Sequence, residues 1–490
     1  TVVKLLKDLL YDVRIEEVFG TTHIAVESIC IDSRMAKPMG LFVAIKGTQV
    51  DGHDYITSAL ANGATTIVCE EVPDGAADIE GTTFVKVKDS SQALGNIASA
   101  YFDNPTSEMK VVAVTGTNGK TTTVSLLHSL FRIMDRKAGL VGTVENKIND
   151  KSVESTHTTP DAISIQKLFR EMADEGCKFC FIEASSHAID QNRLAGTTLA
   201  GAVFTNITHD HLDYHETFDN YISAKKKLFD GLPSNAFALV NAEDLHCEDI
   251  LADCKANKST YGVNAYADEK ARILENQLQG LHLHINGQDL YSRLVGDFNA
   301  SNLMAVFCVA KSLGFDPLAT LTSMSLLTPP AGRFELVESP DGITAIVDYA
   351  HTPDALENVL KTIGAFVNGG EKVITVVGCG GDRDAAKRPI MARVAAASSD
   401  QVFLTSDNPR SEDPSDIIAQ MQAGLDPIDK RKCIAISDRR EAIRAAAAFA
   451  EAGDIVLVAG KGHETYQEIA GVKHDFDDRI ILREALNPSN

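Results

Sequence analysis

No stretch of the 490-residue sequence is apolar for the roughly 20 residues that a membrane-crossing helix requires. We therefore expect no membrane partner. The segment Thr1–Leu10 lacks both the long apolar stretch and the small-residue cleavage site of a signal peptide. Together these absences favour a cytoplasmic protein.

The sequence also lacks any strongly basic segment beyond short runs such as Lys225–Lys227, and its formal net charge is −22. A nucleic-acid-binding protein needs a positive surface that displaces counterions from phosphates, so this class is disfavoured. Local basic residues can still bind an anionic small molecule. We expect small-molecule partners, no nucleic acid and a monomeric protein.

The nine cysteines, an odd number scattered along the chain, show no disulfide framework and indicate reduced thiols. The closest pair, Cys177 and Cys180, lacks the second pair or the histidines at metal spacing that a zinc site needs. Because the pair enters an apolar run at Phe179–Ile182, we expect two core or half-buried thiols.

A chain of 490 residues is too long for a single hydrophobic core and predicts about three domains. The turn-like segment Asp103–Thr106 and the breaker cluster Thr328–Arg333 mark the boundaries. We expect a substrate-binding domain at 1–105, an ATP-binding domain at 106–330 and an amino-acid-binding domain at 331–490.

Strand-like and helix-like segments alternate along the chain, which predicts an α/β fold with buried parallel strands. The central region has a strand–loop–helix order typical of P-loop-type ATPase sheets, and five β/α units predict a Rossmann-like, doubly wound C-terminal domain. The predicted strands are 41–45, 66–69, 110–115, 178–184, 201–207, 236–240, 343–348, 372–377, 401–405, 433–436 and 454–459. The predicted C-terminal helices lie near 353–364, 387–398, 414–423, 438–451 and 478–486.

The strongest motif is a glycine-rich turn between a β-run that ends at Thr115 and a helix that begins near Lys120. Such a turn directs backbone N–H groups and the N-terminal end of the helix dipole at phosphate oxygens. Lys120 would reach the β- and γ-phosphates, and the hydroxyl of Thr121 or Thr122 would bind Mg²⁺. The general P-loop pattern requires glycine where Val114 stands. The alternative, a simple glycine turn before a helix, is disfavoured by the GKTTT sequence.

Two later segments supply candidate ligands for the metal and the nucleotide. Glu183 ends an apolar strand, where a lone carboxylate is costly without a cation. The segment Thr205–His215 contains three histidines and two aspartates. It could simply be exposed to solvent. Because it follows the third strand of a phosphate-loop domain, the alternative is that it faces the nucleotide.

Lys225 occupies an apolar position of a predicted helix. The apolar residues of the segment 218–229 recur at helical spacing, and Lys225 fills the missing position on their stripe while Lys226 and Lys227 point elsewhere. An ammonium on an apolar face should have a lowered pKa and a reactive neutral amine. The alternative is a lysine that extends its charged end to solvent.

Taken together, the motifs GTNGKTT, EASSH, HDHLDYH and DYAHTPDALE resemble the Mur ligase family of peptidoglycan-building amino-acid ligases, in order and over nearly the whole chain. Within the family, the chain is similar to the ligases that add the third residue to UDP-N-acetylmuramoyl-L-alanyl-D-glutamate. The resemblance implies an ATP-dependent, amide-bond-forming enzyme that uses ATP and Mg²⁺.

The resemblance assigns roles to residues of the nucleotide site. It implies that Lys120, Glu183, His211 and Lys225 are catalytic, that Lys225 is carbamylated, and that Thr121, Glu183, His211 and Lys225 bind magnesium. The implied ATP-binding residues are Gly116, Thr117, Asn118, Gly119, Lys120, Thr121, Thr122, Asn302, Arg333, Asp348 and His351.

The resemblance also implies where the nucleotide-sugar substrate binds. The uridine nucleotide would contact Ser33, Gly47, Thr48 and Gln49, and the muramoyl-dipeptide would contact Thr158, Thr159, Ser185, Gln191 and Arg193. His157 stands where related enzymes can carry asparagine, so its own role stays open.

The segment Asp407-Asn408-Pro409-Arg410 resembles the DNPR motif of ligases that are selective for meso-diaminopimelate. The planar guanidinium of Arg410 suits the distal carboxylate of that donor, whereas lysine carries only an ammonium there. Without the resemblance, the segment is an Asx turn before a helix. Arg388, Gly460 and Glu464 would complete the pocket, and the glycines at 378–381 form a strand-end turn.

The predicted reaction has two steps: the D-glutamyl carboxylate attacks the γ-phosphate of ATP, and the donor amine then displaces phosphate from the acyl phosphate. His211 or a nearby carboxylate would accept the amine proton. Four alternatives stay open: the same ligation with L-lysine, a folylpolyglutamate-type or other related ligase, a P-loop regulatory ATPase, and an NAD-binding oxidoreductase.

Overall fold

The computed structural model describes residues 2–154, 160–207 and 218–488. The chain forms two compact units. The first contains the described residues up to Ile273 with Leu283–Leu290 and Ala300–Leu326, and the second contains Leu274–His282, Tyr291–Asn299 and the residues from Leu327. Within the described part of the chain, no helix is both long and apolar enough to cross a membrane.

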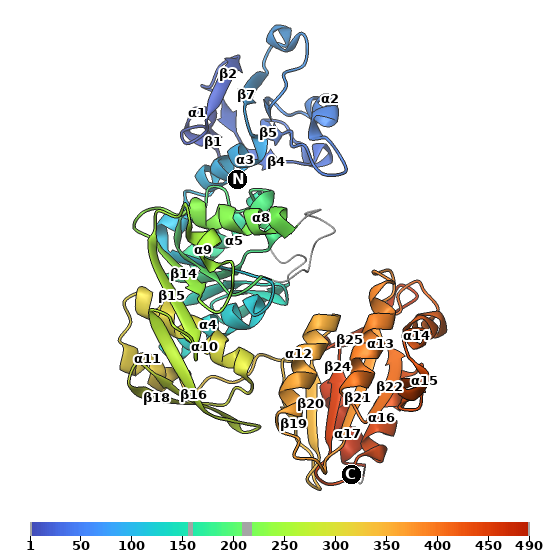
Figure 1. Cartoon of the computed structure of the whole chain (residues 1–490). Coiled ribbons are helices and arrows are strands. Elements are labelled where there is room, and N and C mark those ends of the chain that lie inside the picture. Colours follow the sequence, from blue (N-terminus) through green and yellow to red (C-terminus); the bar gives the residue numbers. More distant parts are fainter. Residues whose placement is uncertain (1, 155–159, 208–217, 489–490) are drawn as a thin grey trace. The chain divides into compact units, whose positions relative to one another are not determined.

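The N-terminal region forms a five-stranded sheet in the order β2-β7-β6-β5-β4 (Figure 1). Only β2 is antiparallel to its neighbour. The central strands are entirely buried because helices cover them, which explains their unbroken apolar sequence. The strands are β2 (Ile15–Phe19), β4 (Ser28–Cys30), β5 (Gly40–Val43), β6 (Thr66–Cys69) and β7 (Thr83–Val87), with a small pair β1 (Lys4–Leu5) and β3 (Ala25–Val26). The helices are α1 (Leu6–Leu9), α2 (Ile56–Ala61) and α3 (Ser90–Tyr101).

The central region is built on an eleven-stranded sheet in the order β11-β10-β9-β12-β8-β13-β14-β15-β16-β17-β18. The strands from β9 to β16 in this order are parallel. The strands are β8 (Lys110–Thr115), β9 (Ala138–Val141), β10 (Glu145–Ile148), β11 (Lys151–Glu154), β12 (Phe179–Glu183), β13 (Leu199–Phe204), β14 (Phe237–Asn241), β15 (Asn257–Val263), β16 (Glu269–Gln277), β17 (Gly280–Ile285) and β18 (Gln288–Ser292). The helices are α4 (Lys120–Ile133), α5 (Ala162–Asp174), α6 (Ser186–Asp190), α8 (Phe218–Asp230), α9 (Cys247–Leu251), α10 (Asp297–Ser312) and α11 (Pro317–Met324).

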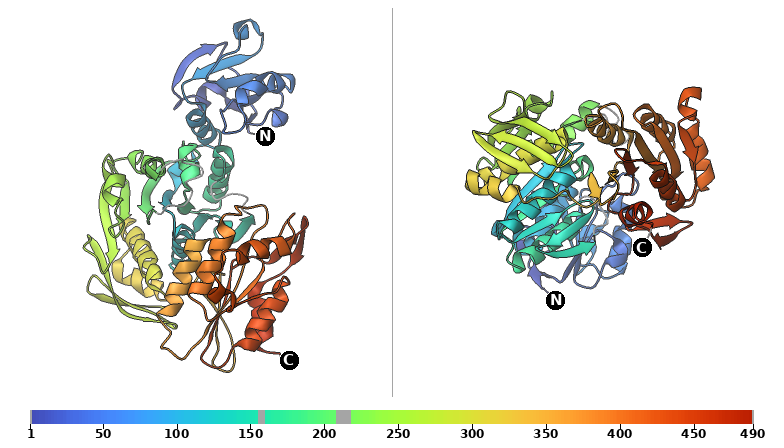
Figure 2. Two further views of the ribbon diagram at one scale, coloured as in Figure 1. Left: turned by 45° about the vertical axis from the view of Figure 1, so that its right-hand side comes forward. Right: turned by 90° about the horizontal axis from the view of Figure 1, so that it is seen from below.

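The C-terminal region is a six-stranded sheet in the order β19-β20-β24-β21-β22-β23, with helices on both faces (Figure 1, Figure 2). One apolar core joins α12, α13 and α14 to the sheet, and a second joins α16 and α17 to it. The strands are β19 (Glu335–Val337), β20 (Thr344–Asp348), β21 (Val373–Cys379), β22 (Gln401–Ser406), β23 (Cys433–Ala435) and β24 (Ile455–Ala459), followed by the hairpin β25 (Tyr466–Ile469) and β26 (Val472–Asp475). The helices are α12 (Pro353–Gly364), α13 (Lys387–Ala397), α14 (Pro414–Gln422), α15 (Pro427–Lys430), α16 (Arg439–Phe449) and α17 (Asp478–Leu486).

The predicted α/β class and the doubly wound C-terminal sheet are confirmed. The predicted strands 66–69 and 110–115 and the helices 353–364 and 478–486 have the predicted bounds, and the other predicted elements shift by a few residues. The sequence prediction missed the extension β15–β18 and the hairpin β25–β26. Cys177 and Cys180 are both buried free thiols, as predicted.

Candidate active site

The glycine-rich turn lies between β8 and α4, at the carboxyl end of the central sheet. Gly116 has φ 141° and Gly119 has φ 87°, a backbone region that favours glycine. A Cβ atom on Gly116 would lie 1.9 Å from the Oγ1 atom of Thr205, so no side chain fits there. The turn therefore requires both glycines.

The residues after β13 hold this phosphate loop in shape. The hydroxyl of Thr205 donates to the carbonyl oxygen of Asn118 at 2.6 Å, and the Oδ1 atom of Asn206 accepts the Asn118 N–H at 2.9 Å. The Thr117 N–H donates to the carbonyl oxygen of Asn206 at 2.8 Å. Hydrogen bonds within the chain thus fix the shape of the loop, which reduces the cost of phosphate binding.

Two lysines converge on one carbonyl oxygen of the loop. The Nζ atom of Lys120 donates to the Gly116 oxygen at 2.6 Å, and the Nζ atom of Lys225 donates to the same oxygen at 3.0 Å. Lys225 is 1% exposed, and burial together with the nearby Lys120 ammonium places its pKa well below the ordinary value. The predicted fall in pKa is confirmed, and extension of Lys225 to solvent is wrong.

The neighbours of Lys225 explain its buried position. The Tyr221 ring lies 4.9 Å from its Nζ atom, and the Tyr221 hydroxyl is 3.0 Å from the Thr117 Oγ1 atom. Lys226, on another side of α8, instead forms ion pairs with Asp230 at 2.8 Å and Asp253 at 2.5 Å.

Glu183 ends β12, beside the loop strand β8, and is 1% exposed. Its carboxylate accepts the Thr121 hydroxyl at 2.7 Å and the Thr143 N–H at 2.7 Å. The structure thus brings together two of the predicted magnesium ligands. Carboxylate and hydroxyl oxygens are the ligand type that Mg²⁺ prefers, so this donor set fits the ion. Thr143, whose hydroxyl also lies 3.1 Å from the carboxylate, was missed from the sequence.

Asn302 on α10 lies directly beneath the loop. Its Oδ1 atom would be 2.6 Å from a Cβ atom on Gly119, and it accepts the Thr123 hydroxyl at 3.5 Å. Thr122 lies in the first turn of α4. The structure therefore places the whole predicted set from Gly116 to Thr122 in one turn, with Asn302 in contact with it.

The predicted nucleotide-sugar residues of the N-terminal region occupy two separate turns. Ser33 is 6% exposed, and its carbonyl oxygen accepts the Nδ2 group of Asn62 at 2.9 Å. The Gly47 N–H donates to Val50 at 2.8 Å and closes the turn that carries Thr48 and Gln49.

The described dipeptide residues of the central region, Ser185, Gln191 and Arg193, flank α6. The Ser185 hydroxyl caps α6 by accepting the Ala188 N–H at 3.1 Å. The Gln191 side chain accepts the guanidinium of Arg193 at 2.8 Å. Outside the described residues lie four positions considered from the sequence: His157, Thr158, Thr159 and His211.

The DNPR segment follows β22, at the carboxyl end of the C-terminal sheet. Arg410 has φ 52°; its Nη1 group donates to the Gly381 oxygen at 2.8 Å, and its Nε atom lies 3.7 Å from Glu468. A Cβ atom on Gly381 would lie 1.8 Å from the Pro409 oxygen. Gly380 and Gly381 follow the end of β21, as predicted, whereas Gly378 lies within the strand. The turn supports the DNPR segment.

Four predicted donor residues meet around one residue that was missed. Asp407, Asn408 and Glu464 surround the Nζ atom of the fully buried Lys461. Gly460 lies against Asp407, since a Cβ atom on Gly460 would be 2.7 Å from the Asp407 Oδ2 atom.

Arg388 lies behind this pocket and is 2% exposed. Its guanidinium donates to Glu412 at 2.6 Å, to Gln420 at 2.9 Å and to the Gly380 oxygen at 3.0 Å. The hydrogen bond from Arg388 lowers the pKa of Glu412 to about 2. Arg388 therefore holds Gly380 in place, and the neighbouring Gly381 contacts Arg410.

The remaining predicted nucleotide residues cluster at the end of β20. Asp348 is buried, and its carboxylate accepts the N–H groups of Phe334 at 2.7 Å and Ala350 at 2.8 Å. Burial raises its pKa. The Arg333 guanidinium lies 4.9 Å from the Tyr349 ring centre. The Nδ1 atom of His351 is 3.0 Å from the backbone carbonyl oxygen of Tyr349.

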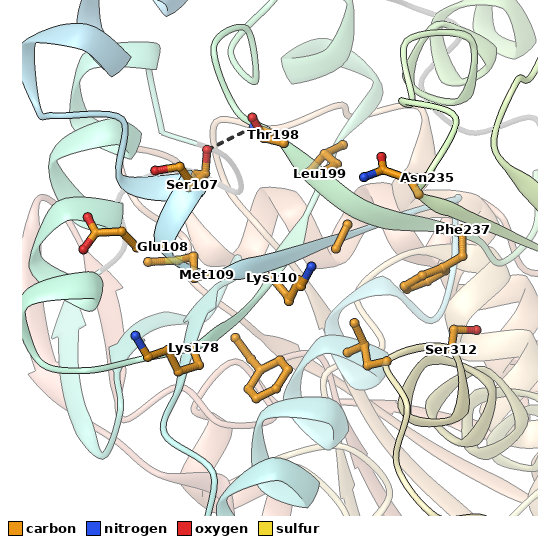
Figure 3. Close-up of a pocket in the computed structure, with 15 residues that line it drawn as sticks. Ser107, Glu108, Met109, Lys110, Lys178, Thr198, Leu199, Asn235, Phe237 and Ser312 are labelled. Atoms are coloured by element: carbon orange, nitrogen blue, oxygen red, sulfur yellow. Dashed lines mark hydrogen bonds between the residues drawn. The ribbon is translucent and has the colours of Figure 1, made fainter.

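A cavity of about 580 Å³ lies away from these residues, at the amino ends of β8, β12, β13 and β14 (Figure 3). Lys110, Lys178 and Asn235 are among its lining residues. Phosphate-binding loops lie at the carboxyl ends of such strands, so this cavity is not part of the site.

Three family models match the chain in sequence order. They are the Mur ligase family catalytic domain at residues 25–102, the Mur ligase middle domain at 114–310, and the Mur ligase glutamate ligase domain at 332–462. The chain therefore belongs to the Mur ligase family, with its three-domain architecture.

The individual relatives indicate one particular kind of Mur ligase. A UDP-N-acetylmuramoyl-L-alanyl-D-glutamate--2,6-diaminopimelate ligase of Cytophaga hutchinsonii is 52% identical, over 98% of this chain and 99% of the relative. The enzyme of the same name from Bacteroides thetaiotaomicron is 50% identical, over 99% and 100%. A solved structure of a ligase with this name has a TM-score of 0.71 at 33% identity, covering 99% of both chains.

Proposed function

We propose that this chain is an ATP-dependent ligase of the MurE type, which adds meso-diaminopimelate to UDP-N-acetylmuramoyl-L-alanyl-D-glutamate in peptidoglycan precursor synthesis. The observation that carries the proposal is the presence of two sites in one chain: a hydrogen-bonded phosphate loop beside Glu183, and an Arg410 pocket at the DNPR segment. Relatives that carry this name are about half identical over nearly the full length. The domain boundaries are proposed near residues 105 and 330.

The first step makes an acyl phosphate. An oxygen of the D-glutamyl carboxylate forms a bond to the γ-phosphorus of ATP, and the bond to the β–γ bridging oxygen breaks, which releases ADP. Two anions must approach each other, so the reaction needs fixed positive charge where the phosphate charge develops. Lys120 and the N–H groups at the start of α4 would supply it from this chain.

Magnesium fits beside the loop and would neutralise phosphate charge when bound. The residues that would hold it are Thr121, Glu183, His211 and Lys225 as a carbamate. A lysine whose pKa is lowered by burial is partly a neutral amine, which is the form that adds CO₂. The carbamate would convert a second positive charge into an anionic ligand, and so relieve the repulsion between Lys120 and Lys225.

The second step joins the donor. The donor amine attacks the acyl carbon, a tetrahedral intermediate forms, phosphate leaves, and the amine proton passes to His211 or to a nearby carboxylate. In the donor pocket, Arg410 would bind the distal carboxylate of diaminopimelate and Glu464 its distal ammonium. L-lysine lacks the carboxylate and would leave Arg410 without its ligand. The uridine nucleotide would bind at Ser33 and residues 47–49.

The test is a coupled ADP-release assay with purified protein, magnesium and UDP-muramoyl-dipeptide. We expect ADP formation to require the dipeptide and to be supported by meso-diaminopimelate far better than by L-lysine. Equal rates with L-lysine would assign the donor differently. ADP formation without the dipeptide would instead indicate a regulatory ATPase, and no ADP formation at all would refute the proposal.

A further inference from the structure

A buried lysine stands at the centre of the C-terminal pocket. Lys461 follows β24 and is 0% exposed. Its Nζ atom donates to the Asn408 Oδ1 atom at 2.8 Å and lies 3.4 Å from Glu464 and 3.6 Å from Asp407. Burying an ammonium is costly unless it is paired and hydrogen-bonded, so this position needs a reason.

The backbone holds Lys461 in place through the glycines on both sides. Gly460 has φ 116° and Gly462 has φ 52°. A Cβ atom on Gly460 would lie 2.7 Å from the Asp407 Oδ2 atom, and one on Gly462 would lie 2.6 Å from the Tyr349 Cβ atom. Both neighbours are therefore confined to glycine, and the Lys461 side chain is directed at the DNPR segment.

The charges around Lys461 do not cancel. Its one ammonium faces two carboxylates, Asp407 and Glu464, which leaves one negative charge in a buried cluster. Burial raises the pKa of Glu464, and the Lys461 ammonium opposes that rise. The cluster can therefore accept one further ammonium.

The other titratable groups that face the cluster do not change this balance. Arg439 is matched by Asp478 at 2.7 Å, and Arg410 lies 3.7 Å from Glu468. Other groups near the cluster include Tyr349, Tyr466, Cys379 and His351. Burial raises the pKa of Tyr349 and of Cys379 to about 12, raises that of Tyr466 and lowers that of His351, so these groups are neutral near pH 7.

Lys461 and the Glu468 N–H together determine which way the Asn408 amide faces. The Asn408 Oδ1 atom accepts from Lys461 at 2.8 Å and from the Glu468 N–H at 2.9 Å. Because both partners are donors, the oxygen side of the amide must face them. The amino side then faces the opposite way and offers N–H groups to an acceptor.

We propose that Lys461 is a positioning residue of the donor pocket, which fixes the Asn408 amide and leaves one negative charge for the distal ammonium of the donor. This inference rests on the proposed function. It gives Lys461 no contact with the reacting atoms.

The test compares Lys461→Met with Lys473→Met in the full chain. Lys473 is a matched control because it is exposed and lies over the Tyr466 ring at 4.4 Å, whereas Lys461 lies 5.5 Å from the same ring. Loss of one buried charge-assisted hydrogen bond should raise the donor KM about tenfold or more in Lys461→Met. The KM values for ATP and UDP-muramoyl-dipeptide should stay within about twofold, as should all three in the control.

A double-variant measurement separates positioning of the Asn408 amide from general damage. Lys461→Met added to Asn408→Ala should raise the donor KM little beyond Asn408→Ala alone, because the amide that Lys461 orients is already absent. Additive or worse loss would overturn the proposal, as would an unchanged donor KM in folded Lys461→Met.

A charge-preserving variant covers the case in which Lys461→Met does not fold. Lys461→Arg keeps the charge and the N–H donors, so the donor KM of folded Lys461→Arg should stay within about fivefold, and a larger rise would overturn the proposal. The wild-type assay is run first. If the wild type forms no donor-dependent ADP, the proposed function fails; if it does, the variants decide the role of Lys461.

Discussion

Lys225 and Lys120 donate to the same Gly116 oxygen. Two positive charges held this close together would repel each other. The buried lysine has the lowered pKa, and the lysine at the start of α4 is the one that the phosphate-loop motif requires for phosphate. We therefore propose that the two side chains divide the roles: Lys120 binds phosphate, and Lys225 is the lysine that becomes a carbamate. This division makes a prediction at the scale of one residue.

Lys225→Ala should lower ligation by roughly 10²-fold or more, because the site loses the group that we propose as an anionic ligand. Short carboxylates such as acetate, added to the assay, should partly restore the rate by occupying the space left beside Thr115. The measurement is ADP release with all substrates present. Lys226→Ala is the control, since Lys226 pairs with Asp230 and Asp253 instead.

Near-normal ligation by Lys225→Ala would contradict the ligand role. Loss in Lys225→Ala without any rescue, together with an equal loss in Lys226→Ala, would indicate damage to α8 rather than to the site.

At the scale of elements, one buried ion pair joins the strand ends that carry the donor pocket. Arg439 begins α16 and pairs with Asp478 of α17 at 2.7 Å, with both side chains fully buried. The same guanidinium donates to the Ser406 oxygen at 3.0 Å, where β22 ends, and to the Ala459 oxygen at 3.1 Å, where β24 ends. It thereby sets the spacing between the DNPR segment and Gly460.

Arg439→Met should lower the free energy of unfolding by about 3–5 kcal/mol, because it leaves Asp478 buried without its partner. Urea denaturation measures the change. Arg439→Met combined with Asp478→Leu removes both charges and should recover part of the loss. Arg444→Met, which breaks an exposed pair with Glu441, should cost less than about 1 kcal/mol. A loss in Arg439→Met no larger than in Arg444→Met would contradict the structural role.

The elements that could be predicted from the sequence are those with a strong period. Lys110–Thr115 is an apolar run because parallel strands are buried on both faces, and α12 has a wide apolar stripe. The strand β17 (GLHLHI) was missed, although its leucines and histidines alternate as its burial does. Histidine at the half-buried positions concealed a pattern of period 2 that a search for continuous apolar runs does not find.

The residues of the site also differ in how well the sequence predicts them. Lys225 could be found because its helix gives it a predictable face. Thr143 and Lys461 could not, because their partners Glu183 and Asn408 lie 40 and 53 positions away in the sequence. Only the fold brings these residues together, and no local pattern marks them.

At the scale of the whole molecule, the chain divides its chemistry between two compact units. The phosphate loop with Lys120, Glu183 and Lys225 lies in the first unit, and the pocket of Asp407, Arg410 and Lys461 lies in the second. A ligand that binds only the folded state stabilises the unit that contains its site. The nucleotide should therefore act mainly on the first unit, through its phosphates, although the predicted nucleotide residues Arg333, Asp348 and His351 lie in the second unit. The donor should act on the second unit alone.

We expect two transitions in differential scanning calorimetry, each raised by a different ligand. A non-hydrolysable ATP analogue with magnesium, at about 100 times its Kd, adds about 2.7 kcal/mol and should raise one transition by roughly 5 °C. Diaminopimelate alone should raise the other. Lys120→Met should abolish the nucleotide shift and keep the donor shift, whereas Arg410→Ala should do the reverse. A single transition whose temperature either ligand raises equally would mean that the two units unfold together. The two sites would then not stabilise separate parts of the molecule.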